Sequence, residues 1–302
     1  MFKIGIALVL AIILLIPGAL VGGNLVFRAT TGVDLISSAV YAAQLTAPVD
    51  ESIVCPDAIT QDDMVKASDT INNSVANMIV HNNGQFTIDL EQSATNNSMN
   101  GYIKLNGKEV ASLAQIIMSQ EDLGQIGINE ETYIDVAFKQ VNFESIDRYN
   151  TRVSVVMTIN TSSIKQEIKA MAFGDAINDD VITTPEQVLD TSLTIVPDIL
   201  YVTSTFVVEE AEGFECSIAH ESLAINSLTV ENTVVLFNTV NFFSKLGDAQ
   251  YFNEQIANAI MDALIGTPGN DEDTGFAESL QDLGATGYDF VTENGVTYFV
   301  VK

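Results

Sequence analysis

Residues 199–224 carry the pattern that decides the fold, and they read ILYVTSTFVV (199–208), EEAEG (209–213) and FECSIAHESLA (214–224). Both outer segments are rich in β-branched and aromatic residues, and apolar side chains recur in them at alternate positions. The five residues between them are mostly acidic and end in glycine, which suits an exposed turn. The stretch therefore predicts two long antiparallel strands that form a hairpin with an acidic tip.

An amphipathic helix is predicted after this hairpin, from Gly247 and Asp248 to a stop at Gly266 and Pro268. Its apolar stripe consists of Phe252, Ile256, Ile260 and Leu264, supplemented by Ala259 and Ala263. Long antiparallel strands packed on amphipathic helices predict an α+β fold. The stripe has two interpretations: the wall of a groove that binds an apolar ligand, or ordinary core.

Two strand–cap–helix units precede the hairpin. In the first, residues 102–105 predict a strand, Asn106 caps a helix, and Val110 and Leu113 begin its apolar stripe. In the second, residues 155–159 predict a strand, Asn160 is the cap, and Ile164 opens the stripe. The two units fit either an internal repeat or ordinary α+β construction. Between them, residues 132–138 and 140–143 alternate like a half-buried sheet.

Weaker signals complete the pattern outside these units. Thr60 predicts the start of a helix, and Asn82–Gly84 predicts a turn into a strand at 85–90. Residues 228–237 and 241–246 are further apolar segments, and 280–283 form a short helix. The Asn294–Gly295 step joins strands at 288–292 and 296–301, which is a strong hairpin signal.

The N-terminus predicts a membrane anchor. Residues 4–27 carry no charge, and a run of about 20 apolar residues is enough to cross a bilayer. A cleaved signal peptide is the alternative, but the run is long for one and has no clear cleavage site. We expect a signal anchor at 1–27, a juxtamembrane connector with a short helix (33–43) at 28–59, and an extracytoplasmic domain at 60–302. This domain has one or two subdomains, with a boundary near 150–190.

The composition restricts the partners. Twelve Lys and Arg residues oppose 40 Asp and Glu residues, so the formal net charge is −28. This excludes nucleic acid as a partner, because its binding depends on basic side chains. The acidic residues concentrate in 170–301, which fits a solvated acidic surface or a surface for cations or a basic partner.

No motif for catalysis, a cofactor or a metal is present in the sequence. His81 and His220 lack partners at a known spacing, and residues 270–275 miss the EF-hand pattern. Cys55 and Cys216 are the only cysteines; they form one disulfide in an exported domain or remain two buried thiols. We therefore expect a protein without enzymatic activity, while a hydrolase built from dispersed carboxylates stays an alternative.

The order of these elements resembles that of membrane-anchored extracytoplasmic proteins of the YpmS type and, more distantly, the tubular lipid-binding superfamily. The strand-to-helix junctions at 105–113 and 159–164 carry the resemblance, and the hairpin and the helix at 251–264 add to it. It implies a non-enzymatic envelope protein that binds a lipid or another apolar ligand outside the membrane. The alternative function is an assembly module that docks envelope proteins through its acidic face or a sheet edge.

Overall fold

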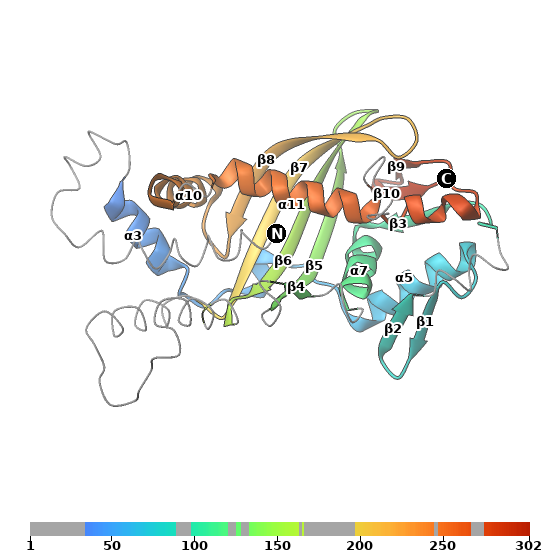
Figure 1. The fold of residues 1–302 in the computed structure, drawn as a ribbon, viewed down its shortest axis with the longest axis horizontal. Helices are drawn as coiled ribbons and strands as arrows, with labels where there is room; N and C mark the ends of the chain where they lie inside the picture. The colour runs from blue at the N-terminus through green and yellow to red at the C-terminus, as the bar shows by residue number, and fades with distance from the viewer. Residues whose placement is uncertain are drawn as a thin grey trace.

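A five-stranded antiparallel sheet forms the centre of the molecule (Figure 1). The computed structural model describes residues 34–88, 98–119, 125–127, 133–162, 165, 197–244, 247–266 and 275–302. The strands follow the chain in the order β4-β5-β6-β7-β8, each paired with its neighbours in sequence. Their bounds are Gln125–Gly127 (β4), Tyr133–Ser145 (β5), Asn150–Asn160 (β6), Ile199–Glu210 (β7) and Cys216–Ile225 (β8). The predicted hairpin is confirmed as β7 and β8.

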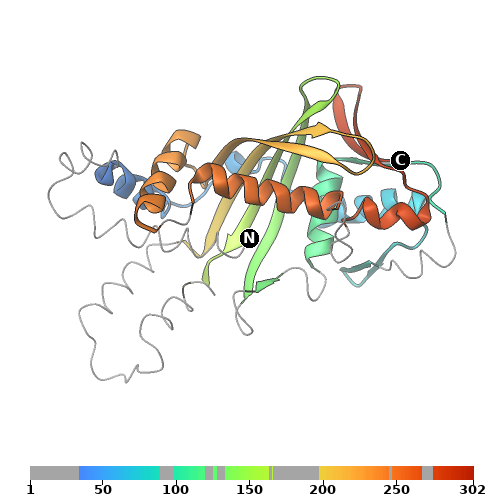
Figure 2. The ribbon, with the colours of Figure 1, turned by 45° about the horizontal axis from the view of Figure 1, so that its top comes forward.

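Helices cover one face of this sheet (Figure 2). Helix α11 (Ala249–Leu264) packs on β7 and β8, α10 (Val230–Ser244) packs on β8, and α7 (Gly107–Met118) packs on β5. Alternate residues of β7 face these helices and are buried: Leu200, Val202, Ser204, Phe206 and Val208. The apolar residues that alternate in the sequence of this strand are thus those that point toward the helices, and the residues between them point to the opposite face.

A second sheet joins the strands at 288–301 to a strand from the first half of the sequence. It has three antiparallel strands in the order β3 (Ile103–Asn106), β10 (Val296–Val301) and β9 (Tyr288–Glu293). The predicted Asn294–Gly295 hairpin is confirmed, and both turn residues have positive φ. The third strand of this sheet, β3, lies almost 200 positions earlier in the sequence than β10, with which it pairs. One apolar core runs through the molecule from Ala42 to Val301.

The remaining elements surround these sheets. Helix α5 (Gln61–Ser74) packs on α7, and α3 (Leu35–Gln44) packs on α10. The other elements are α4 (Glu51–Val54), the hairpin of β1 (Ile79–Asn82) and β2 (Gln85–Ile88), and the 3-10 helix η1 (Glu278–Leu283). The α+β fold class is therefore shown, with antiparallel sheets and amphipathic helices.

Helix starts agree with the sequence. Thr60, Asn106 and Asp248 each accept a hydrogen bond from a backbone N–H of the helix that follows, as predicted. The two alternating segments at 132–138 and 140–143 form one strand, β5, with a bulge and a register shift between Phe138 and Gln140. The two apolar segments within 228–246 form mainly one helix, α10. The intrinsic helix propensity of this segment is low, and packing on β8, α3 and α11 compensates for it.

Several predictions fall on residues that the structure does not describe. The anchor at 1–27 lies outside the described residues, as do most of the second unit's helix and residues 270–274 of the acidic loop. Within the described ranges, no helix combines the length and apolarity needed to span a membrane. The subdomain boundary at 150–190 begins in β6 and continues beyond the described part.

Candidate functional site

The C-terminal half of α11 lies between two hollows. The first, which we call the β8–α11 cavity, has a volume of about 350 Å³. The second, the α7–α11 groove, has a volume of about 60 Å³. Ligand sites for small molecules typically occupy about 300–1,000 Å³, so only the first has the size of a ligand site as it stands.

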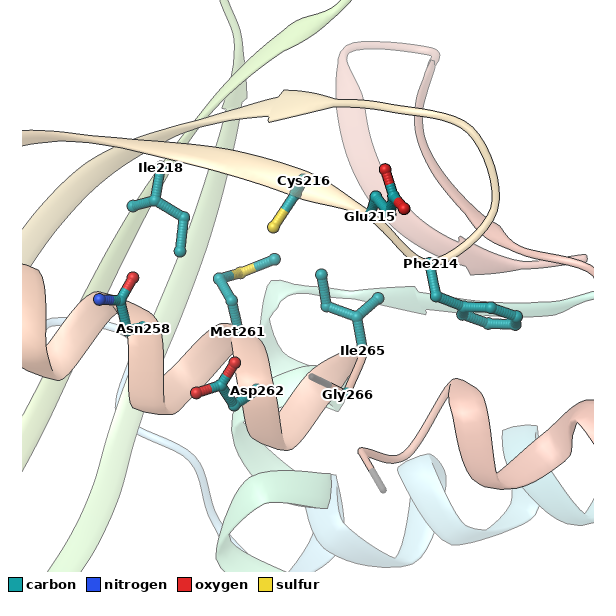
Figure 3. A pocket seen from close by; sticks show the side chains of 9 residues that line it. All are labelled: Phe214, Glu215, Cys216, Ile218, Asn258, Met261, Asp262, Ile265 and Gly266. Carbon is teal, nitrogen blue, oxygen red and sulfur yellow. The ribbon is translucent and has the colours of Figure 1, made fainter. Parts of the chain in front are cut away.

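The β8–α11 cavity has an apolar floor and a polar rim. Its lining residues are Phe214, Glu215, Cys216, Ile218, Asn258, Met261, Asp262, Ile265 and Gly266. Figure 3 shows Cys216 and Ile218 pointing from β8 toward α11, with Met261 and Ile265 pointing back. Asn258 and Asp262 are one helical turn apart on α11 and are exposed. The cavity is therefore lined by apolar and sulfur-bearing side chains together with two carboxylates, Glu215 and Asp262, and one amide, Asn258.

The Cys216 thiol is unsuited to nucleophilic chemistry. Burial raises the pKa of Cys216, the Asp262 carboxylate raises it further, and the Tyr288 hydroxyl only partly opposes them. The thiol therefore stays protonated at neutral pH, whereas a cysteine nucleophile acts as a thiolate. His220 lies four residues further along β8, about 13 Å away at strand spacing. No Cys–His pair forms.

His220 instead has a structural partner. The Asn253 side-chain nitrogen lies 2.6 Å from His220 Nδ1. Asn253 Oδ1 accepts from the Ser204 hydroxyl at 2.6 Å, which identifies the Asn253 nitrogen as the donor toward His220. His220 is therefore a partly buried histidine with a hydrogen-bond partner, and the contact connects α11 to β7 and β8.

The α7–α11 groove contains half of the predicted ligand stripe. Ile260 and Leu264 line it, whereas Phe252 and Ile256 are completely buried in the core. The other lining residues are Val110, Ala114, Ile117, Met118, Phe138, Val141, Ala259 and Ala263. The groove is thus apolar throughout, but it is too small to hold an acyl chain without movement of α7 or α11.

The two cysteines are free thiols, so the disulfide alternative is wrong in this structure. Cys55 packs against Val156 and Tyr201 near the start of β7, whereas Cys216 pairs with Glu210 at the other end of that strand. Nine residues of strand separate Tyr201 from Glu210, a distance of about 30 Å. A disulfide needs Cα atoms within about 7 Å.

A carboxyl pair missed by the sequence reasoning lies where β7 meets β9. The pKa of Glu210 is raised to about 8, first by burial and then by a hydrogen bond with Asp289 and the charge of that group. Lys302 Nζ lies 2.9 Å from Asp289 Oδ2, and the Phe290 N–H donates to Glu210 Oε1 at 3.2 Å. Neither carboxyl group lines the cavity or the groove, so the pair does not form a hydrolase site with either hollow.

This pair predicts a loss of stability as the pH rises from mildly acidic to about 8. Because the folded-state pKa of Glu210 is raised, its contribution is complete below its ordinary pKa of 4.5 and is lost as the pH rises through about 8. Asp289 has a lowered pKa and acts in the opposite sense, losing its contribution below its ordinary value of 3.8. We expect Glu210→Gln to reduce the fall in Tm between about pH 5 and pH 8, measured by circular dichroism. The neighbouring exposed Glu209→Gln is the control, and equal pH profiles for the two variants would contradict the assignment.

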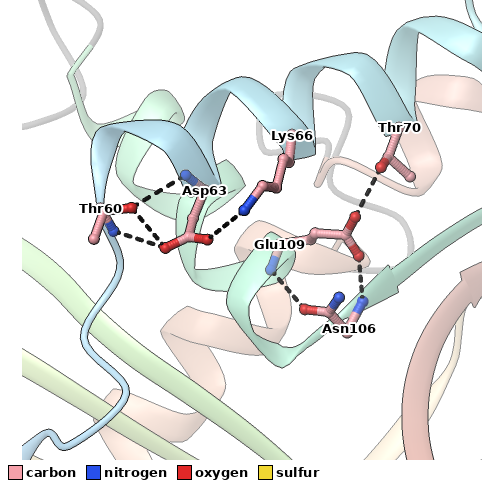
Figure 4. A network of polar contacts seen from close by, with 6 residues as sticks. All are labelled: Thr60, Asp63, Lys66, Thr70, Asn106 and Glu109. Atoms are coloured by element: carbon pink, nitrogen blue, oxygen red, sulfur yellow. Dashed lines mark hydrogen bonds and ion pairs between the residues drawn. The ribbon is translucent and has the colours of Figure 1, made fainter.

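Two polar networks where α5 meets α7 hold helix ends (Figure 4). Thr60 and Asp63 exchange hydrogen bonds across the first turn of α5, and Asn106 and Glu109 do the same on α7. Thr70 on α5 donates to Glu109 Oε1 at 2.7 Å and so ties the helices together. These carboxylates are engaged in capping boxes and serve the fold.

Among the described residues, no group of three His, Cys, Asp or Glu side chains is placed to hold a metal ion. The other histidine, His81, stacks on Phe86, with ring centroids 4.5 Å apart.

Comparison with protein-family models, curated proteins and solved structures finds no significant match for this chain.

Proposed function

We propose that the chain is a membrane-anchored, extracytoplasmic binding protein without enzymatic activity, and that it takes a lipid or similar amphiphile in the β8–α11 cavity. The observation that carries this proposal is the cavity itself, whose volume of about 350 Å³ lies in the range of small-molecule sites. Its floor of Cys216, Ile218, Met261 and Ile265 suits an apolar chain. The uncharged segment at 4–27 supports the membrane location.

The rim of the cavity selects the head group. Asp262 and Glu215 supply carboxylates and Asn258 an amide, and no basic residue is present among the lining residues. The net charge of −28 adds a field that repels anions. A neutral or cationic head group is therefore favoured over a carboxylate or phosphate.

Cys216 provides a direct test, because it lines the cavity and can report its occupancy. The full chain in phosphatidylcholine nanodiscs is alkylated with N-ethylmaleimide at mildly alkaline pH, where a fraction of Cys216 ionises despite its raised pKa, and modification of each cysteine is followed by peptide mass spectrometry. We expect dodecylamine to slow alkylation of Cys216 by about fivefold or more, and dodecanoate to slow it less. Cys55, packed against Val156 and Tyr201, is the internal reference. Equal alkylation of Cys216 with and without saturating dodecylamine and dodecanol would refute cavity binding.

Asp262→Asn tests the head-group assignment separately. We expect it to weaken protection by dodecylamine by about fivefold, because a partly exposed charge interaction contributes about 1 kcal/mol. Protection by dodecanol should not change. The matched control is Asp282→Asn, an exposed carboxylate that does not line the cavity. Equal losses for both amphiphiles would show that Asp262 shapes the cavity without selecting the charge.

A second candidate function is an assembly module, favoured by the position of β8 at the edge of the five-stranded sheet. Edge strands present backbone N–H and C=O groups to other chains. This candidate predicts salt-sensitive capture of a basic envelope protein, and absence of such a partner at low salt would count against it.

A further inference from the structure

Helix α3 is uncharged and has two distinct faces. Its sequence is LISSAVYAAQ, and its N-cap is Asp34, which accepts a hydrogen bond from the Ser37 N–H. Ser38 and Ala42 are completely buried on the inner face. The Ser38 hydroxyl lies 2.7 Å from the Thr239 hydroxyl of α10, which fixes the rotation of α3 about its axis.

The outer face exposes large apolar side chains. Ile36 is 56% exposed and Val40 is 50% exposed, and they lie one turn apart on the side opposite Ser38. Ala43 is exposed on the same side. In a chain with a net charge of −28, an exposed helix face without a single charged residue is unusual for a surface that meets only water.

The position of α3 identifies what covers this face. Figures 1 and 2 place α3 at the end of the molecule remote from the C-terminus and from β1 and β2. The predicted anchor ends at Phe27, and only residues 28–33 separate it from Asp34. Six residues span at most about 20 Å, so α3 is held close to any bilayer that contains the anchor.

We propose that the outer face of α3 rests on the bilayer, with Ile36 and Val40 in the interfacial region. This inference depends on the membrane anchor of the proposed function, but not on the cavity. An uncharged helix gains its binding energy from apolar burial alone. The net charge of the chain opposes anionic lipids, so the partner surface is zwitterionic.

Single tryptophans test this contact cleanly, because the chain contains no tryptophan. The variants are Val40→Trp and Ile36→Trp on α3, and Tyr102→Trp as the control. Tyr102 is 69% exposed and precedes β3 at the far end of the molecule. Each full-length variant is reconstituted into phosphatidylcholine vesicles with either ordinary or brominated acyl chains, and its fluorescence is measured after flotation.

We expect brominated lipid to quench Val40→Trp and Ile36→Trp about twofold or more, with a blue-shifted emission, because both indoles enter the interface. Tyr102→Trp should keep its intensity and emission maximum. If all three variants float with the vesicles but are quenched equally little, the α3 contact is refuted while the anchor stands. If none of them floats, the anchor of the proposed function fails, and with it the reason for placing α3 on a bilayer.

Discussion

Replacing Gly107 with alanine is expected to destabilise the fold by about 3 kcal/mol or more, although alanine is normally the better residue in a helix. Gly107 is the first residue of α7, at the point where this helix contacts β5. A Cβ atom there would lie 2.1 Å from the carbonyl oxygen of Val141 and 3.0 Å from its carbonyl carbon. Both atoms belong to the backbone of a central strand, so no side-chain rotation relieves the overlap.

Equilibrium unfolding in urea measures this effect, with Lys108→Ala as the control. Lys108 is the next residue of the same helix and is exposed, so its replacement changes helix propensity without a steric overlap. We expect Lys108→Ala to remain within about 0.5 kcal/mol of the unmodified chain. A Gly107→Ala variant as stable as this control would mean that α7 and β5 are further apart than described.

Asn253→Leu is expected to cost about 3 kcal/mol by leaving buried polar groups without partners. Asn253 is completely buried on α11, accepts from the Ser204 hydroxyl at 2.6 Å and donates to the Thr205 carbonyl at 2.9 Å. Ser204 is also completely buried. Leucine has the same branched skeleton of side-chain heavy atoms but bulkier methyl groups, so the loss combines unsatisfied hydrogen-bonding groups with some crowding in the core.

A double-mutant cycle with Ser204→Ala isolates this contribution. When both partners are apolar, neither side chain leaves the other unsatisfied. The double variant should therefore lose about 1–2 kcal/mol less free energy of unfolding than the two single variants lose together. Urea unfolding of the four proteins gives the coupling. Strict additivity would show that the Ser204–Asn253 hydrogen bond contributes nothing to the attachment of α11.

The predictions that succeeded rest on interactions between residues close in the chain. Capping by Thr60, Asn106 and Asp248 involves a side chain and a backbone group three residues away. The Asn294–Gly295 turn is likewise decided by its own two residues, which adopt positive φ. Such local signals are readable from one sequence because the interacting groups are neighbours in it.

The parts that sequence reasoning missed depend on tertiary contacts. The helix propensity of α10 is weakened by Val, Thr, Asn and Phe residues, and its state is decided by packing on β8, α3 and α11. The four stripe residues all lie on α11 and in the core, but their spacing could not show that only Ile260 and Leu264 border the groove. The larger cavity arises on a different face of that helix, where Asn258 and Asp262 break the apolar pattern. The Glu210–Asp289 pair joins residues from two separate strands and has no local signal.

The pairing of β3 with β10 sets a limit on when this chain can finish folding during synthesis. Ile103 pairs with Val301, and β10 is the middle strand of its sheet. Until residues 296–301 have left the ribosome, neither β3 nor β9 has its partner β10, although β5, β6, β7 and β8 are already complete. The long antiparallel sheet can therefore form first, whereas closure of the small sheet waits for β10 and requires a contact of very long sequence separation, which is slow to form. Until then β3 presents unpaired backbone groups, which makes this interval the one most exposed to proteolysis and misassociation.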